Sequence, residues 1–345
     1  MRMRQHAKYS RADRTRPANE LLRPGLPHPN GWFCVGFSRE WQPGTVRSRP
    51  FMDGEVVIYR TRSGLLRATR PYCPHLGTHL GVGGTVDGEY LVCPFHSFAF
   101  SPEGPCVRTP YGPPPKASLS LLPVREANGI VWVWNSHDDT PPDWEVPELT
   151  TVGRALSYRT ADLAGYPQDI AENAVDFGHL PEVHGVSVLE TPPKPTSDGP
   201  YYHVEGYVGR PVPLLGTIAS RTRLHFVGLG GTHLLFEFPQ VGVRASAWLL
   251  VTPIGPLRIR WWTVVNAAPN DPPRVLMPLH RLLARPLEQA LSHAICLWTH
   301  KDVERDLVIF NHRQYLPHPR LNSKEGPIGS LRQWARQFYP PTQPS

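Results

Sequence analysis

Two short stretches decide the fold of this chain, Cys73-Pro74-His75 and Cys93-Pro94-Phe95-His96. Each stretch offers one thiolate and one imidazole, and a proline follows each cysteine. Two thiolates and two imidazoles can hold one [2Fe–2S] cluster, with both sulfurs on one iron and both nitrogens on the other, which is Rieske ligation. Because neutral imidazole replaces anionic thiolate, such a cluster has a raised potential. This potential suits the transfer of single electrons to an oxygen-activating centre.

A zinc site is the main alternative, because two cysteines and two histidines are also a zinc-binding set. Zinc fingers place both cysteines in one knuckle and both histidines on a helix, whereas each stretch here supplies one of each. Chance proximity of four residues is a further alternative, but β-type runs bound both stretches. The spacing therefore favours the iron–sulfur cluster.

A second group of polar residues lies around Pro181. Asn173, Asp176 and His179 recur once per helical turn, so we expect a helix that carries all three on one face. Pro181 does not fit the interior of that helix, and the break it causes would turn His184 back toward His179. Two histidines and a carboxylate form the facial triad of non-haem Fe(II) oxygenases, which leaves coordination positions open for O2. Taken alone, this run also fits a polar helix face or two hydrogen-bonded histidines, but the upstream Cys/His pair favours iron.

With these motifs the chain resembles the Rieske non-haem iron oxygenases, and most of all the branch of ketosteroid 9α-hydroxylases and cholesterol 7-desaturases. The resemblance extends from about Pro29 to Tyr339. Carried over residue by residue, it implies four ligands of the [2Fe–2S] cluster, which are Cys73, His75, Cys93 and His96.

The resemblance also assigns the residues around Pro181. It implies that His179 and His184 are ligands of a mononuclear iron. Asp176 matches the carboxylate that bridges the two metal sites in this family. We therefore expect Asp176 to provide the electron-transfer bridge, and we include Asn173 with it among the catalytic residues.

The third iron ligand depends on how the C-terminal helix is aligned with the family, which places an aspartate four residues before a tryptophan. Alignment on Trp298 puts Ala294 in the ligand position and leaves the iron without its carboxylate. Alignment with Phe310 in the tryptophan's place puts Asp306 there, and we therefore predict Asp306. Asp302 is an alternative ligand, and a solvated helix charge is the simpler interpretation of either aspartate.

Other positions distinguish the type of cluster. Ser97-Phe98 follow the cluster histidine where the family usually has Gly-Trp, which alters packing and removes no ligand. Respiratory-type Rieske proteins carry an additional cysteine in each cluster loop, and Thr78 and Phe95 stand there instead. The chain has five cysteines and no recognisable disulfide framework, so the reduced cytoplasm is the simplest compartment.

Length and composition allow two modest domains, because the chain has 345 residues of which 40% are hydrophobic. We expect a basic, disordered tail at 1–28, an all-β Rieske domain at 29–140 and a catalytic iron domain at 141–345, with a linker at 138–143. The fold class is α+β, and the resemblance implies a helix-grip arrangement, an antiparallel sheet flanked by helices. Expected strands include 55–59, 130–134, 223–227, 233–238 and 257–265, and a helix at 287–313 carries Asp306.

The charge distribution argues against nucleic-acid binding. The net charge is +7, but residues 1–24 hold seven basic and two acidic side chains, so most of the excess lies in the tail. The tail lacks the apolar region of a secretory signal. We expect no transmembrane segment, because the sequence contains no run of about 18 apolar residues.

The resemblance implies an oxygenase that uses O2 and takes electrons from a ferredoxin, a flavin reductase or both. It would hydroxylate or desaturate a bulky apolar substrate such as a steroid. The family also implies a head-to-tail homotrimer in which Asp176 connects His96 of one chain with His179 of the next. Natural-product tailoring or oxidative cyclisation at the same metals is one alternative. An electron carrier or catalytically silent Rieske scaffold is another, and the Ala294 alignment would favour it.

Overall fold

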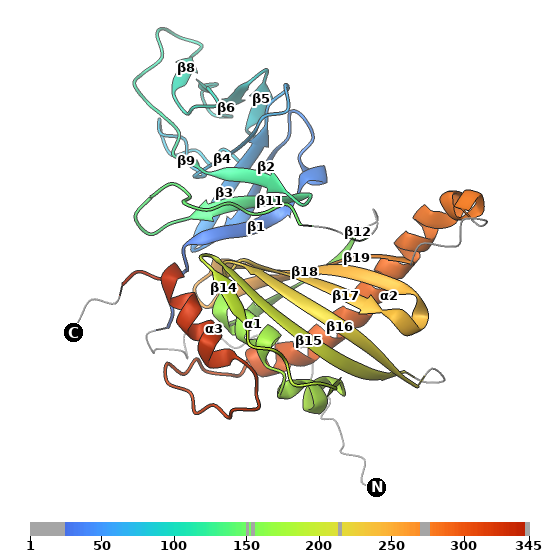
Figure 1. Cartoon of the computed structure of the whole chain (residues 1–345). Coiled ribbons are helices and arrows are strands. Elements are labelled where there is room, and N and C mark those ends of the chain that lie inside the picture. Colours follow the sequence, from blue (N-terminus) through green and yellow to red (C-terminus); the bar gives the residue numbers. More distant parts are fainter. Residues whose placement is uncertain (1–24, 150–151, 153–155, 213–215, 270–276, 342–345) are drawn as a thin grey trace.

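The computed structural model describes residues 25–149, 152, 156–212, 216–269 and 277–341. Two β-rich parts follow one another along the chain, and Figure 1 shows the N-terminal part standing on a large sheet of the C-terminal part. Of the predicted tail at 1–28, only residues 25–28 lie within this description. None of the helices in the described ranges is long and apolar enough to cross a membrane.

The N-terminal part contains three small antiparallel sheets within the described residues. The strands predicted at 55–59 and 130–134 lie in β3 and β11, whose apolar side chains are fully buried. In the order of each sheet, the strands are β1 (Gly31–Phe37), β11 (Ile130–Asn135) and β10 (Val124–Ala127); β2 (Val46–Phe51), β3 (Gly54–Arg60), β4 (Leu66–Thr69) and β9 (Leu121–Leu122); and β5 (Thr85–Asp87), β6 (Tyr90–Val92), β7 (Ala99–Phe100) and β8 (Cys106–Arg108).

The C-terminal part is built on an antiparallel sheet of eight strands among the described residues. Long runs of β-branched and aromatic residues favour these strands, and successive hairpins join β15 to β19. The order is β12 (Leu156–Ala164), β19 (Arg258–Pro269), β18 (Val243–Gly255), β17 (Gly231–Phe238), β16 (Gly216–Val227), β15 (Tyr201–Val212) and β13 (Ser187–Val188), with β14 (Thr196–Asp198) paired to β15. The predicted antiparallel sheet is confirmed.

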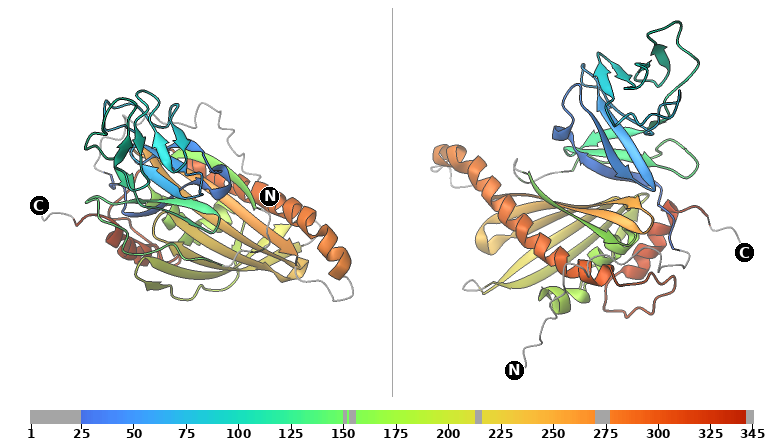
Figure 2. Two further views of the ribbon diagram at one scale, coloured as in Figure 1. Left: turned by 90° about the horizontal axis from the view of Figure 1, so that it is seen from above. Right: turned by 180° about the vertical axis from the view of Figure 1, so that it is seen from behind.

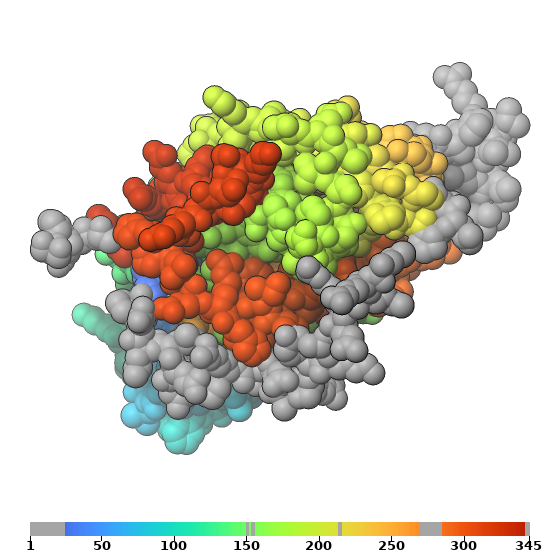
Figure 3. All heavy atoms as spheres, turned by 90° about the horizontal axis from the view of Figure 1, so that it is seen from below, coloured from blue at the N-terminus to red at the C-terminus, as the bar shows by residue number. Residues whose placement is uncertain are grey.

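Helices cover the face of this sheet that lies away from the N-terminal part. The long helix α2 (Met277–Phe310) packs against β12 and β19, and Figure 2 shows it running diagonally across the sheet. Two shorter helices, α1 (Pro167–Val175) and α3 (Ile328–Ala335), pack against each other near the C-terminal end of α2, and the turn η4 (Leu180–His184) lies beside α2. Seen from below, α1, α3 and the end of α2 form a continuous cover (Figure 3).

Tryptophans join the two parts. Trp132 of β11 packs edge to face on Trp248 of β18, with ring centroids 5.6 Å apart, inside a shared buried cluster. Gly230 also lets the two parts approach closely, because a Cβ atom at this position would lie 1.9 Å from the backbone oxygen of Trp32 in β1. The predicted order of an all-β domain followed by a sheet flanked by helices is confirmed.

The predicted helix face around Asp176 is wrong. Helix α1 ends at Val175, so Asp176 and His179 do not share a helix face with Asn173. The Asp176 carboxylate accepts the Gly178 N–H at 2.9 Å, a local turn that competes with continuation of the helix. The break therefore precedes Pro181, which lies in the first turn of η4.

The predicted bounds of the C-terminal helix also need correction. We expected residues 287–313 because the run after Pro286 is helical in composition. Helix α2 instead spans Met277–Phe310, and Pro286 lies inside it. The chain turns at Asn311 and His312, so the helix ends soon after Asp306.

Candidate metal centres

The two cluster loops have the same backbone geometry. In the first, the Cys73 N–H donates to the Thr78 carbonyl oxygen at 2.8 Å, and the Gly77 N–H donates back to the Cys73 oxygen at 2.9 Å. In the second, the Cys93 N–H donates to the Phe98 oxygen at 2.9 Å, and the Ser97 N–H donates to the Cys93 oxygen at 3.1 Å. Backbone hydrogen bonds therefore fix both cysteines in equivalent positions.

The side chains of the loops are arranged in two pairs. Cys73 and Cys93 are buried in the same apolar cluster, and His75 and His96 lie further out, with ring centroids 4.8 Å apart. Burial raises the pKa of the Cys73 thiol to about 11, and the neighbouring Cys93 adds to this rise. Bound iron supplies the positive charge that keeps such thiols deprotonated. The Phe98 ring, in the place of the family's tryptophan, stacks on His75 with centroids 4.3 Å apart.

This pairing fits a two-iron cluster better than a zinc ion. A tetrahedral zinc draws four ligand atoms to within about 4 Å of one another, given bonds of about 2.0 to 2.3 Å. In the described part of the chain, one set of three or more possible ligand atoms lies within 4.8 Å, and it does not include the cluster loops. A [2Fe–2S] cluster requires only that the sulfurs meet at one iron and the imidazoles at the other.

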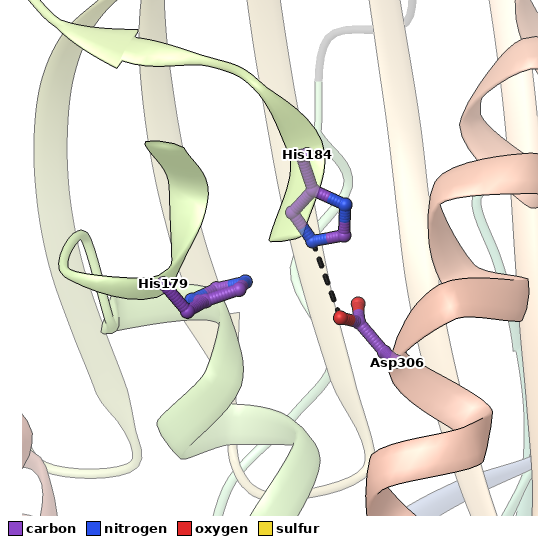
Figure 4. Close-up of side chains that lie close together, drawn as sticks. All are labelled: His179, His184 and Asp306. Carbon is purple, nitrogen blue, oxygen red and sulfur yellow. Dashed lines mark ion pairs between the residues drawn. The ribbon is translucent and has the colours of Figure 1, made fainter. Parts of the chain in front are cut away.

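That one set consists of His179, His184 and Asp306 (Figure 4). His179 lies at the start of η4, His184 is its last residue, and Asp306 comes from α2. His184 Nε2 lies 3.2 Å from Asp306 Oδ1, and the two imidazole rings have centroids 5.0 Å apart. The side chains of His184 and Asp306 are each only 6% exposed. Two neutral nitrogens and one carboxylate in a buried pocket match the ligands of a non-haem Fe(II) site.

Hydrogen bonds from neighbouring residues hold Asp306 and His179 in place. The Asn173 amide donates to Asp306 Oδ2 at 3.2 Å, which leaves Oδ1 for the pocket. His179 Nδ1–H donates to the backbone oxygen of Asp176 at 2.5 Å, and the Asp176 carboxylate lies 3.5 Å from the same nitrogen. Burial alone would lower the pKa of His179, but Asp176, helped by Asp306, raises it. Because a carbonyl oxygen can only accept, its bond to Nδ1 keeps the proton on that nitrogen and directs Nε2 of the neutral ring toward a metal.

The two alternatives to Asp306 are not part of this set. Asp302 forms an ion pair with Arg210 of β15 and belongs to no set of three converging ligands among the described residues. Ala294 is exposed, about three helical turns before Asp306. The alignment on Phe310 is therefore the one that places a carboxylate beside the histidines.

An ionic network behind α1 was missed from the sequence. Arg332 of α3 donates through Nη2 to Glu172 Oε2 at 2.8 Å, and its Nε forms an ion pair with Oε1 at 2.8 Å. Arg313, just beyond α2, pairs with Asp169 at 3.2 Å. These ion pairs tie α1, which carries Asn173, to the two helices that flank it. Charged residues so far apart in the chain give no spacing signal, although a buried polar face on α1 could have pointed to partners.

A Rieske-type β domain joined to a helix-covered sheet with a buried His/His/Asp group defines the class of iron-dependent oxidoreductases that combine a [2Fe–2S] cluster with a second iron. Residues 31–124 match the Rieske [2Fe-2S] domain, and residues 133–211 and 273–339 match the 3-ketosteroid 9alpha-hydroxylase C-terminal domain. The chain belongs to the Rieske non-haem iron oxygenases, in the branch with cholesterol 7-desaturases and 3-ketosteroid 9-alpha-monooxygenases.

Relatives and solved structures agree with this placement. The chain is 31% identical to cholesterol 7-desaturase nvd of Bombyx mori over 96% of this chain and 74% of the relative. It is 25% identical to a probable 3-ketosteroid-9-alpha-monooxygenase oxygenase component of Rhodococcus rhodochrous, over 92% of this chain and 81% of the relative. A similar fold occurs in the NdmA QL mutant of Pseudomonas putida CBB5 with theobromine, with a TM-score of 0.64, 15% identity and coverage of 88% and 89%.

Membership of this family settles the kind of chemistry. The protein is an oxidoreductase that uses a Rieske [2Fe–2S] cluster, non-haem iron and O2. Such an enzyme requires a partner that supplies electrons.

Proposed function

We propose that this enzyme hydroxylates or desaturates one C–H position of a bulky apolar, steroid-like substrate. The observation that carries the proposal is the buried group of His179, His184 and Asp306. The names of the relatives, cholesterol 7-desaturase and 3-ketosteroid-9-alpha-monooxygenase, support the substrate class. So does the apolar interior shared by the sheet and the helices, which includes Phe177 and Leu180, close to His179 in the chain.

The protein's own groups have distinct roles in this proposal. Ferrous iron held by His179, His184 and Asp306 supplies O2 activation, and a cluster held by Cys73, His75, Cys93 and His96 supplies single electrons. Asn173 fixes the outer oxygen of Asp306, so that the carboxylate presents its other oxygen to the metal. The apolar side chains would exclude water and hold the target carbon beside this group of ligands.

We further propose that electrons reach the iron from the cluster of a neighbouring chain in a head-to-tail homotrimer. The first cluster loop precedes β5 and the second lies between β6 and β7. In Figure 1 the sheet of β5 to β8 stands at the opposite end of the molecule from α1. Apolar side chains around the loops are exposed, at 63% for Tyr72, 66% for Leu76 and 63% for Phe95, as expected of a surface that another chain covers. Asp176 would then accept from His96 of one chain and His179 of the next.

Subunit mixing tests the path of the electrons. Chains with Asp306→Ala, which keep the cluster, are co-expressed with chains carrying Cys93→Ser, which keep the iron site. Each variant alone is inactive, and the mixed trimers should regain part of the wild-type turnover because an intact cluster then faces an intact iron site. Mixed trimers, isolated through a different affinity tag on each variant, that stay inactive would contradict transfer between chains.

A turnover assay tests the reaction itself. Iron-loaded enzyme receives a ferredoxin with its flavin reductase as electron donor, O2 and cholesterol or a 3-ketosteroid, and products are analysed by mass spectrometry. Hydroxylation adds one oxygen atom, which 18O2 labels, and desaturation removes two hydrogen atoms. Oxidation of a different apolar scaffold alone would favour natural-product tailoring. A protein that holds only the two irons of its cluster and gives no product would be an electron carrier or a silent scaffold.

A further inference from the structure

The outer ring nitrogen of His184 points to a second function for α2. His184 Nε2 faces Asp306, and the other ring nitrogen, Nδ1, is directed away from that carboxylate. His184 Nδ1 is buried and has no hydrogen-bond partner among the described residues. A buried donor without an acceptor is costly, and a histidine that binds metal through Nε2 must carry its proton on Nδ1.

An acceptor stands close to this nitrogen. Asp302 Oδ1 lies 3.8 Å from His184 Nδ1, so a movement of about 1 Å forms a hydrogen bond of ordinary length. Asp302 and Asp306 are four residues apart on α2 and share one helix face. The two carboxylates therefore meet the same imidazole at its two nitrogens.

Two residues hold Asp302 in this place. Arg210 donates to Asp302 through both terminal nitrogens, at 3.3 Å and 2.5 Å, and this fork fixes the plane of the carboxylate. The Arg210 guanidinium in turn lies over the Trp298 ring, 4.9 Å from its centroid. The Arg210 and Asp302 side chains are 23% and 20% exposed, so the pair is partly shielded from water.

We propose that Asp302 is the positioning carboxylate of His184, accepting its Nδ1–H when Nε2 binds iron, with Arg210 and Trp298 holding Asp302 in place. The inference rests on the proposed role of His184 as an iron ligand. It places a carboxylate near Nδ1 of each histidine, since Asp176 lies 3.5 Å from Nδ1 of His179 and Asp302 lies 3.8 Å from Nδ1 of His184. Because Arg210 balances its charge, Asp302 orients the ring without adding net negative charge beside the iron.

Metal binding by the full-length protein, with its cluster in place, tests this role apart from turnover. Asp302→Ala should weaken Fe(II) binding about 10- to 100-fold in competition with a chelator. It should also shift the visible absorption bands of Co²⁺ bound in place of iron, because the ring can turn. Asp302→Asn, whose amide oxygen still accepts from Nδ1–H, should recover most of the affinity. Glu304→Ala removes an exposed charge from the same helix and should match the wild type.

Three results would overturn the inference. Wild-type affinity and cobalt bands in Asp302→Ala would make the pair with Arg210 purely structural. Complete loss of the metal from both Asp302 variants would make Asp302 a ligand. Equal partial losses in Asp302→Ala and Asp302→Asn, with equally lowered unfolding temperatures, would assign the effect to packing of α2 on β15, since Asp302→Asn retains the acceptor. Wild-type protein that binds no iron beyond the cluster would overturn the proposed function as well, so the two failures are distinguishable.

Discussion

All four predicted cluster ligands come from one short part of the N-terminal domain. The iron pocket instead joins η4 to α2, a helix that follows η4 in the chain only after the strands of the large sheet. In the loops, backbone hydrogen bonds position Cys73 and Cys93. In the pocket, the Asn173 amide holds Asp306 and the backbone oxygen of Asp176 holds His179. The first site therefore depends on local turns and the second on long-range packing, so each should be removable without the other.

The largest expected effect separates the two sites completely. Asp306→Ala removes the carboxylate from the His/His/Asp group, and two imidazoles alone should not retain ferrous iron. We expect bound iron to fall from about three to about two per chain, with the [2Fe–2S] absorption unchanged. Iron analysis and the visible spectrum measure both quantities on one sample.

The matched control is Asp302→Ala on the same helix face. This variant should keep about three irons at saturating Fe(II), although it binds the third more weakly. If the Asp302 variant alone lost its third iron under these conditions, the alignment of α2 on Phe310 would be wrong.

The second prediction concerns the residue that would connect the sites. Asp176→Asn keeps the size of the side chain but loses the charge, and an amide cannot accept from two imidazoles through equivalent oxygens. Both metal centres should remain occupied. Reoxidation of the reduced cluster with O2 and substrate present should slow at least about 100-fold in single-turnover stopped flow.

Two outcomes would change this assignment. Reoxidation at the wild-type rate would mean that electrons take another path. Loss of the third iron would instead make Asp176 a ligand and would remove Asp306 from that role.

The third prediction changes the cluster and leaves the iron pocket alone. His96→Cys replaces a neutral imidazole with an anionic thiolate, so the cluster should persist with a potential lower by on the order of 100 mV or more. Fe(II) affinity at the second site should match the wild type. Redox titration followed by EPR reports the potential, and an unchanged midpoint with a Rieske-type spectrum would show that His96 is not a ligand.

The smallest expected effect compares the two cluster loops with each other. Gly77 and Ser97 occupy equivalent positions with φ of +72° and +54°, a left-handed conformation that glycine adopts without strain. A Cβ atom at Gly77 would meet no atom within 4 Å, so Gly77→Ala tests backbone strain alone and should cost about 1 kcal/mol. Ser97→Gly should stabilise by no more than about 0.5 kcal/mol, because relief of strain is offset by greater freedom of the unfolded chain.

Urea-induced loss of the cluster absorption measures both loop variants. If Gly77→Ala and Ser97→Gly changed the stability by similar amounts in the same direction, the two loops would not be equivalent in the way their hydrogen bonds indicate. The Fe(II) affinity serves as the control and should not change.

Much of the fold could be predicted from local pattern. Alternating apolar residues in the strands of both parts, and one cysteine and one histidine in each loop, led to the correct fold class. The helix bounds could not be predicted in the same way. Gly178 and the Asp176 side chain form a turn that ends α1, and packing on β12 and β19 retains α2 through Pro286 although proline disfavours a helix interior. In both cases, contacts outweighed the preferences of single residues.

The ligands of the iron pocket could be predicted only in part from the sequence. The spacing of His179 and His184 indicated the histidines, but the choice between Asp302 and Asp306 depended on an alignment. The structure distinguishes them, because Asp302 pairs with Arg210 of β15, whereas Asp306 converges with both histidines. Local periodicity cannot predict the pairing of Arg210 with Asp302, because β15 and α2 are distant in the chain.

The position of Asp306 after the whole sheet has a consequence for biosynthesis. When the ribosome has released the N-terminal part, both cluster loops are already complete, and domains generally fold in the order in which they emerge. His184 and Asp306 are separated by every strand from β13 to β19, so the pocket cannot close until α2 has been made. A nascent chain can thus acquire its cluster while it still lacks a place for the mononuclear iron, and the two metals are expected to be delivered in that sequence.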